Sequence, residues 1–197
     1  MSPRRRRLAA PLAAFLLGLV ALGTAAYVTL APSPKVAAVS SVGGPFTLQD
    51  GDGRTVTERD LKGAPFLVFF GFTHCPDICP TKLFEISEIL RAAGPRGDKL
   101  RALFVTVDPE RDTPEVMKSY VSSFDPRILA LTGSQAEIDR VVKSYRAFAK
   151  KAELKEGGYT MEHTSLVYLM DREGRFVGSF NVERPAAKAA EELLARL

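Results

Sequence analysis

Outside its first seven residues, the chain carries no excess of charge of either sign. It has 27 lysines and arginines against 23 aspartates and glutamates, a difference of 27 − 23 = +4. Arg4–Arg7 supply that difference, because removing them leaves 27 − 4 = 23 basic residues against 23 acidic ones. The net positive charge therefore gives no reason to expect a nucleic-acid partner, which would require a basic surface.

Cysteine and histidine are both scarce, with two residues of each in 197. Cys75 and Cys79 lie in one short stretch, directly after five consecutive apolar residues, Phe66–Phe70. Because the chain has no other cysteine, any thiol chemistry or soft-metal binding must use this pair. The alternative interpretation is two unrelated core cysteines, and the closeness of the pair argues against it.

No charged residue occurs between Leu8 and Leu30. A helix of this length is roughly 35 Å long, enough to cross a bilayer. The arginines before it predict that the N-terminus stays in the cytoplasm and that the rest of the chain lies on the periplasmic, extracytoplasmic side of the cell (inner) membrane. A cleavable signal peptide is the competing interpretation, since Gly23–Ala26 offers small residues for cleavage. The run is longer than a usual signal core, which favours an uncleaved anchor.

The sequence therefore predicts four segments. A linker rich in proline and serine follows the anchor, and the remainder is the right size for one domain with its own core. No internal repeat or low-complexity tract is visible beyond the linker. The predicted segments are a cytoplasmic basic tail at 1–7, a transmembrane anchor at 8–30, a linker at 31–43 and a single domain at 44–197.

The cysteine pair lies where a predicted strand, 66–70, gives way to a predicted helix, 81–91. Ligands and reactive groups collect at this edge of an open α/β sheet. The positive end of the helix is expected to favour the thiolate form. In a helical turn, residues four apart share a face, so Cys75 and Cys79 can offer two sulfurs to one ion. Cys79 also begins an apolar stripe and is expected to face inward.

Strand and helix patterns alternate through the rest of the domain. We predict buried strands at 102–107 and 128–131, hairpins at 45–57 and 164–180, a loop or loose hairpin at 150–160, and a closing helix at 185–197. Thr113 with Pro114 and the capping box Ser134–Glu137 begin two further helices, the second with Phe148 on its apolar face. This order predicts an α/β, thioredoxin-like fold with an N-terminal β-hairpin extension, preceded by one transmembrane helix.

His163 is expected to open the strand at 164–170 and to face the cysteine pair. In thioredoxins a cis proline stands before the equivalent strand, whereas here Glu162, His163 and Thr164 take that place. Two thiolates and an imidazole suit copper(I), and suit zinc if a fourth ligand is found. His74 adjoins Cys75 in sequence, so its side chain is expected to point away from the site.

Three segments resemble the Sco/SenC family, and the resemblance extends from Phe46 to the last helix and includes the N-terminal anchor. The segments are Gly71-Phe72-Thr73-His74-Cys75-Pro76-Asp77-Ile78-Cys79-Pro80, Val107-Asp108-Pro109-Glu110-Arg111-Asp112-Thr113-Pro114 and Glu162-His163-Thr164-Ser165. The resemblance implies a thioredoxin-like fold and one copper ion bound by Cys75, Cys79 and His163. It also implies a role in assembling the copper A centre of cytochrome c oxidase. Many relatives have aspartate where this chain has Glu162, which keeps the charge with a longer reach.

Three functions from different classes follow. The first is a membrane-anchored copper metallochaperone, a binding protein that takes copper(I), with copper(II) left open. The second is an enzyme, a thiol–disulfide reductase of the copper A cysteines or of other exported proteins. The third, a thiol peroxidase, is disfavoured because Phe72 stands where peroxiredoxins have threonine. The expected partners are the copper A subunit of the oxidase and another periplasmic copper chaperone or a thioredoxin-like reductant.

Four acidic and basic residues in the second segment, 108–112, allow two interpretations. Asp108, Glu110, Arg111 and Asp112 form either a site near the copper loop, which docks a partner or supports the metal ligands from outside, or ordinary turn and helix-cap chemistry in which Arg111 pairs with a carboxylate. The second interpretation is preferred. Asp77 is expected to stabilise the adjacent helix N-terminus by its charge, and a carboxylate is a poor ligand for soft copper(I).

Overall fold

The computed structural model describes residues 16–24 and 42–197. The chain divides into two units, Met1–Ala38 and Val39–Leu197. In the first unit, residues 16–24 form an exposed helix. Within the two described ranges, no helix combines the length and the apolar character needed to cross a bilayer. Three predicted segments lie wholly or mostly outside the described residues: the tail at 1–7, the anchor at 8–30 and the linker at 31–43.

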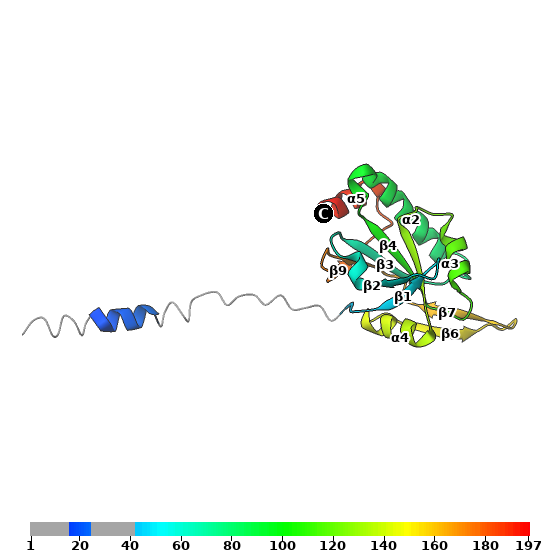
Figure 1. Cartoon of the computed structure of the whole chain (residues 1–197), viewed down its shortest axis with the longest axis horizontal. Coiled ribbons are helices and arrows are strands. Elements are labelled where there is room, and N and C mark those ends of the chain that lie inside the picture. The colour runs from blue at the N-terminus through cyan, green and yellow to red at the C-terminus, as the bar shows by residue number, and fades with distance from the viewer. Residues whose placement is uncertain (1–15, 25–41) are drawn as a thin grey trace, which may run out of the picture. The chain divides into compact units, whose positions relative to one another are not determined.

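Seven strands of the second unit form one sheet, in the order β2-β1-β5-β4-β3-β8-β9 (Figure 1). Strands β3, β4 and β5 are parallel, and antiparallel strands extend the sheet at both edges. The strands are β1 (Thr47–Asp50), β2 (Thr55–Thr57), β3 (Phe66–Gly71), β4 (Arg101–Thr106), β5 (Ile128–Thr132), β8 (Val167–Met170) and β9 (Phe176–Ser179). The predicted strands and both predicted hairpins are therefore confirmed.

The three parallel strands form the centre of the core. Every residue of β3 is buried, and only the first residue of β4 is partly exposed. Parallel strands that are covered on both faces have nearly continuous apolar sequences instead of an alternating pattern. This burial explains why these strands were recognisable as unbroken apolar runs.

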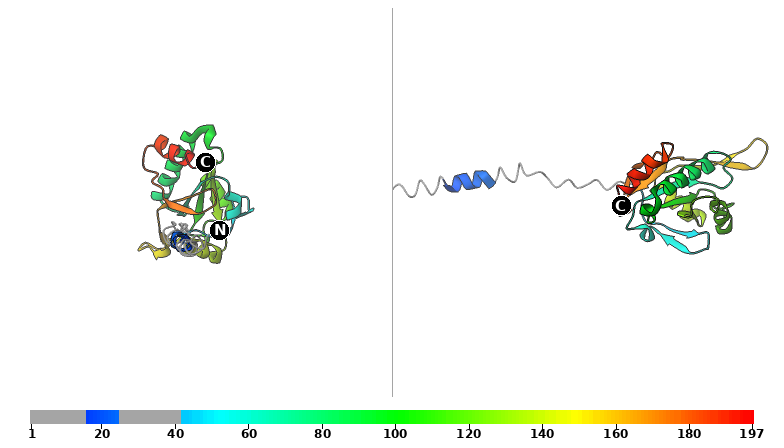
Figure 2. Two further views of the ribbon diagram at one scale, coloured as in Figure 1. Left: turned by 90° about the vertical axis from the view of Figure 1, so that its left-hand side faces the viewer. Right: turned by 90° about the horizontal axis from the view of Figure 1, so that it is seen from above.

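Helices cover both faces of the sheet. They are α2 (Ile78–Ala93), α3 (Pro114–Val121), α4 (Gln135–Ser144) and α5 (Ala186–Leu194), with short 3₁₀ turns at Glu58–Leu61 and Gly94–Gly97. Helices α2 and α5 pack side by side, and α4 lies across the sheet from them (Figures 1 and 2). The connections through α2 and α3 step across the sheet in one direction, so right-handed crossovers place both helices on one face.

The predicted helix starts at α3 and α4 are confirmed by their caps. The Thr113 hydroxyl accepts a hydrogen bond from the Val116 amide. Ser134 and Glu137 form the reciprocal capping box, in which the Glu137 carboxylate accepts from the Ser134 amide at 2.8 Å. The prediction for Phe148 is wrong, because this side chain is 53% exposed and lies beyond the end of α4. Arg146 adopts a left-handed backbone with φ 51, which ends the helix.

The segment predicted as a loop or loose hairpin is a regular hairpin of two strands, β6 (Ala149–Glu153) and β7 (Tyr159–His163). It forms a sheet of its own and extends away from the seven-stranded sheet (Figure 1). His163 is therefore the last residue of β7 and does not open the strand that follows, since β8 begins at Val167.

A buried ion pair holds the turn before β5. Both carboxylate oxygens of Asp125, which is 6% exposed, accept hydrogen bonds at 2.8 Å from the Arg127 guanidinium. Replacing Asp125 by asparagine is expected to lower the free energy of unfolding by about 1.5–3 kcal/mol at neutral pH, because charge-assisted bonds are lost. Urea unfolding of wild type and variant across the acidic range measures this loss.

The loss of unfolding free energy caused by Asp125→Asn is expected to depend on pH. The hydrogen bonds from Arg127 hold the pKa of the Asp125 carboxyl below its ordinary value. The carboxylate therefore stabilises the folded state fully above its unfolded pKa, about 3.9. This stabilisation is lost as the pH falls through the lower folded-state pKa. A difference between wild type and variant that is the same in strong acid as at neutral pH would contradict the ion-pair account.

Candidate metal centre

Two cysteines lie where the central strand β3 passes into helix α2. Cys75 is in the loop after the strand, and Cys79 is the second residue of the helix, which begins three residues earlier than predicted. The Cys79 amide donates to the Cys75 sulfur at 3.3 Å, so this sulfur accepts a hydrogen bond in the first turn. Asp77 is exposed at the N-cap position and makes no side-chain cap hydrogen bond.

Cys79 faces the core, as its place in an apolar stripe predicted. Its side chain is fully buried, while Cys75 is partly exposed, and neither cysteine is in a disulfide. The expectation that the helix terminus favours thiolate is wrong for Cys79, because burial raises the pKa of its thiol. Copper that binds this sulfur must therefore displace a proton, since the ligand is a thiolate.

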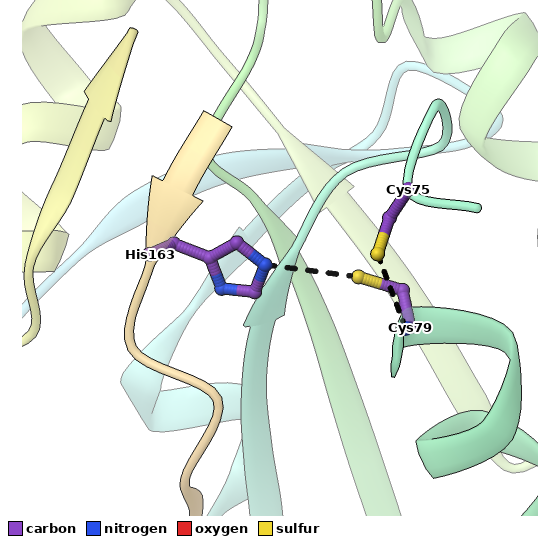
Figure 3. Close-up of side chains that lie close together, drawn as sticks. All are labelled: Cys75, Cys79 and His163. Carbon is purple, nitrogen blue, oxygen red and sulfur yellow. Dashed lines mark hydrogen bonds between the residues drawn. The ribbon is translucent and has the colours of Figure 1, made fainter. Parts of the chain in front are cut away.

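His163 reaches the cysteine pair from the end of β7 (Figure 3). Its Nε2 lies 3.9 Å from the Cys79 sulfur. Its Nδ1 lies 3.0 Å from the carbonyl oxygen of Thr164. A carbonyl only accepts hydrogen bonds, so Nδ1 carries the proton and Nε2 presents its lone pair to the sulfurs. Burial lowers the pKa of His163, which keeps the imidazole neutral and able to bind a metal.

One ligand atom from each of Cys75, Cys79 and His163 lies within 4.8 Å of the other two. Among the residues that the structure describes, these three form the only group of at least three cysteine, histidine or carboxylate side chains so arranged. Two sulfurs and one imidazole form a soft set that suits copper(I), whereas a structural zinc site would need a fourth ligand.

His74 lies outside this group. It is exposed, and its Nδ1 lies 3.2 Å from the hydroxyl of the neighbouring Thr73. The structure thus separates the two histidines of the chain, one beside the sulfurs and one at the surface of the loop.

Two aromatic rings pack against the imidazole of His163. The Phe72 ring meets the His163 imidazole edge-on, with centroids 5.6 Å apart and an interplanar angle of 89°. Phe69 packs on the same imidazole at 6.4 Å. Both phenylalanines are buried. They restrict the rotation of the histidine ring and exclude water from its inner side.

Asp112 is a buried residue that the sequence analysis assigned to turn chemistry. Its carboxylate accepts hydrogen bonds from the Thr73 amide at 3.1 Å, the Thr73 hydroxyl at 2.6 Å and the Thr106 hydroxyl at 2.6 Å. These bonds join the cysteine loop to the end of β4. The sequence offered a partial signal, because an aspartate that closely follows a buried strand and a threonine two residues before Cys75 are both expected at the same sheet edge. Neither residue indicates which partner it binds. The predicted pairing of Arg111 with a carboxylate is confirmed, and its partner is Asp108.

Gly71 ends β3 directly beneath the site. A Cβ atom at this position would lie 2.6 Å from the Phe104 ring and 2.8 Å from the Cys79 sulfur. Gly71→Ala is therefore expected to cost about 1–3 kcal/mol by overpacking and to lower copper affinity by displacing that sulfur. Chemical unfolding and chelator competition measure the two effects. Gly178→Ala in β9 is the matched control, because a Cβ there meets no atom within 4 Å, and equal losses in both variants would contradict this expectation.

A family model described as SCO1/SenC matches residues 34–197. The chain belongs to the SCO1/SenC family. The structure of Bradyrhizobium japonicum ScoI with copper bound is similar to it, with a TM-score of 0.77 and 58% identity over 79% of this chain and 99% of that one. A second similar structure is that of BsSco, described as a member of the Sco family of cytochrome c oxidase assembly proteins with a disulfide switch. It has a TM-score of 0.63 and 27% identity over 79% of this chain and 94% of that one.

The mitochondrial SCO1 homolog 1 of Arabidopsis thaliana is 41% identical over 139 residues, which are 70% of this chain and 42% of that protein. The matched region thus spans less than half the length of this relative. The thioredoxin-like α/β fold predicted for the domain is confirmed by the SCO1/SenC neighbours.

Proposed function

We propose that the chain is a copper metallochaperone that holds one copper ion on Cys75, Cys79 and His163. It assists assembly of the copper A centre of cytochrome c oxidase. The observation that carries this proposal is the convergence of two sulfurs and one imidazole nitrogen within 4.8 Å. The 58% identity to a ScoI structure with copper bound supports copper as the metal.

Copper is the cargo of this site, and its chemistry fits the donors. Soft thiolates and an imidazole favour copper(I) over harder ions. The proton on Nδ1 of His163 is fixed by Thr164, so Nε2 is the nitrogen that faces the ion. Cys75 is partly exposed, which gives an acceptor protein a route for ligand exchange at one sulfur, while Cys79 and His163 retain the ion from within.

The second candidate is a thiol–disulfide reductase that acts on the cysteines of the copper A site. It is favoured by one observation, the pair of unbridged thiols at a sheet edge, one in the loop after β3 and one in the first turn of α2. The disulfide switch named for BsSco supports reversible oxidation in the family. The two functions are compatible, because copper loading requires reduced thiols.

The full-length, reduced protein is expected to bind one copper(I) ion in anaerobic titration against a competing chelator. X-ray absorption on the same sample should count two sulfur neighbours and one nitrogen. A copper shell of oxygen and nitrogen alone would overturn the proposed ligand set.

We further propose that residues 8–30 anchor the chain with its C-terminal domain outside the cytoplasm. The support is Arg4–Arg7 ahead of an uncharged run. The protein is expected to sediment with membranes and to resist extraction by high salt. A mature N-terminus near Ala26, found by N-terminal sequencing, would show cleavage and contradict the anchor.

A further inference from the structure

The hairpin that carries His163 is not part of the main sheet. Among the residues described, the ladder of β6 and β7 joins only these two strands. No backbone ladder hydrogen bond therefore joins this hairpin to the central strands in the described residues. The position of His163 relative to the Cys79 sulfur depends instead on the side-chain contacts between the hairpin and the rest of the domain.

Tyr159, at the opposite end of β7 from His163, contacts Arg111 and Asp108 in the loop after β4, and an exposed ion pair between Lys151 and Glu110 joins the same hairpin and loop. The Arg111 guanidinium carbon lies 3.9 Å from the centre of the Tyr159 ring. A nitrogen of the same guanidinium donates to the Tyr159 carbonyl oxygen at 3.1 Å. The Tyr159 hydroxyl donates to the Asp108 carboxylate at 2.9 Å. Tyr159 is thus held by a ring contact, by one hydrogen bond from its hydroxyl and by one hydrogen bond to its main-chain carbonyl.

The partners of Tyr159 are themselves fixed. The Asp108 carboxylate is buried and forms an ion pair with Arg111. The Asp108 amide donates to the Thr106 hydroxyl at the end of β4 at 2.9 Å. Lys151 also lies over the Tyr159 ring, at 4.2 Å, but this lysine is exposed and adds little. The rigid part of the contact is therefore Arg111 with Asp108.

Arg111 is also linked to the metal centre indirectly, because it contacts Phe72, which packs against His163. Its guanidinium carbon lies 5.8 Å from the centre of the Phe72 ring, and Phe72 packs edge-on against His163. A single guanidinium therefore contacts the first residue of β7 directly and its last residue through Phe72. The Tyr159 end of the strand is thus held against the loop after β4, and the His163 end packs against the cysteine loop.

We propose that Arg111 and Tyr159 form a clamp that positions His163 for copper binding. The inference rests on the proposed function and adds two positioning residues to it. Neither residue offers a ligand atom to the metal group. The clamp acts by fixing the hairpin, so that the imidazole meets the sulfurs without a further ordering step.

Tyr159→Leu tests the clamp, because it removes the ring contact and the hydroxyl and leaves the Asp108–Arg111 pair intact. In the full-length reduced protein, copper(I) affinity by chelator competition is expected to fall about 10-fold, a loss typical of positioning partners of a metal-binding histidine. Amide hydrogen exchange in β6 and β7 of the copper-free protein should become faster, while β3 and β4 keep their protection. Tyr159→Phe retains the ring and should lose less affinity.

Lys150→Ala is the matched control. It removes one positive charge from the same hairpin, and residue 150 points to the opposite side of the strand from Lys151. Within the described part of the chain, the Lys150 side chain makes no ion pair or hydrogen bond. Its affinity and exchange should equal those of wild type. If Tyr159→Leu does not fold, Arg111→Lys replaces it, because lysine keeps the charge and loses the planar contact.

Wild-type affinity in the Tyr159 and Arg111 variants would overturn the clamp, as would an equal loss in Lys150→Ala. A wild-type protein that fails to bind copper(I) would instead overturn the proposed function. In that case hydrogen exchange still decides the clamp, since unchanged exchange in β6 and β7 of Tyr159→Leu would show that Tyr159 does not fasten the hairpin.

Discussion

Replacing Cys79 by serine is expected to abolish tight copper(I) binding and dithiol exchange together. The substitution exchanges a soft sulfur for a hard oxygen, which is a poor copper(I) ligand. Only Cys75 and His163 would remain of the three donors that converge within 4.8 Å. Loss of an outer partner of a metal ligand commonly costs about 10–100-fold in affinity, so loss of a ligand itself is expected to cost more than 100-fold. Chelator competition on the full-length reduced protein measures this.

Folding must be controlled for, because Cys79 is fully buried. An unpartnered serine hydroxyl at this place costs about 1–3 kcal/mol, and Cys79→Ala avoids that penalty while also removing the sulfur. Both variants should fail to bind copper at temperatures where circular dichroism shows them folded. Wild-type protein oxidised to the Cys75–Cys79 disulfide should fail in the same way, since the bridge consumes both thiolates. Copper binding by either folded variant at wild-type affinity would show that Cys79 is not a copper ligand.

The parts of the fold that the sequence predicted are those set by local chemistry or by complete burial. The caps at Thr113 and Ser134 follow from a hydroxyl that satisfies free helix amides. Strand β3 was recognisable because both of its faces are covered, and Cys79 was placed inward because it continues the apolar stripe of α2. In each case the residues that determine the local structure are close together in the sequence.

The parts that could not be predicted depend on contacts between distant segments. Strand β6 is mostly exposed and β7 only half-buried, so neither shows the alternation that identifies a strand. Consequently the hairpin was predicted only as a loop or loose hairpin, and His163 was placed on the wrong strand although it was placed beside the right partners. The role of Asp112 depends on Thr73, which lies 39 residues away in the chain. No local pattern contains that pairing.

Replacing His163 by alanine is expected to separate copper binding from thiol chemistry. The variant loses the imidazole nitrogen that lies 3.9 Å from the Cys79 sulfur and keeps both cysteines. Weak copper(I) binding through two thiolates survives, with an affinity lowered by more than the about 10–100-fold that loss of an outer partner of a metal ligand costs. Dithiol exchange is expected to persist, because attack needs only a thiolate and an accessible disulfide.

His74→Ala is the matched control, because it removes the other histidine of the chain, which is exposed and lies outside the group of three ligand atoms. Its copper affinity and exchange rate should equal those of wild type. The decisive measurement is assembly of cytochrome c oxidase at limiting copper in cells that express each variant. A chaperone function requires that His163→Ala fails to support assembly while it still exchanges disulfides. Full assembly in that variant would show that His163 is not a working ligand, and the reductase function would then take precedence.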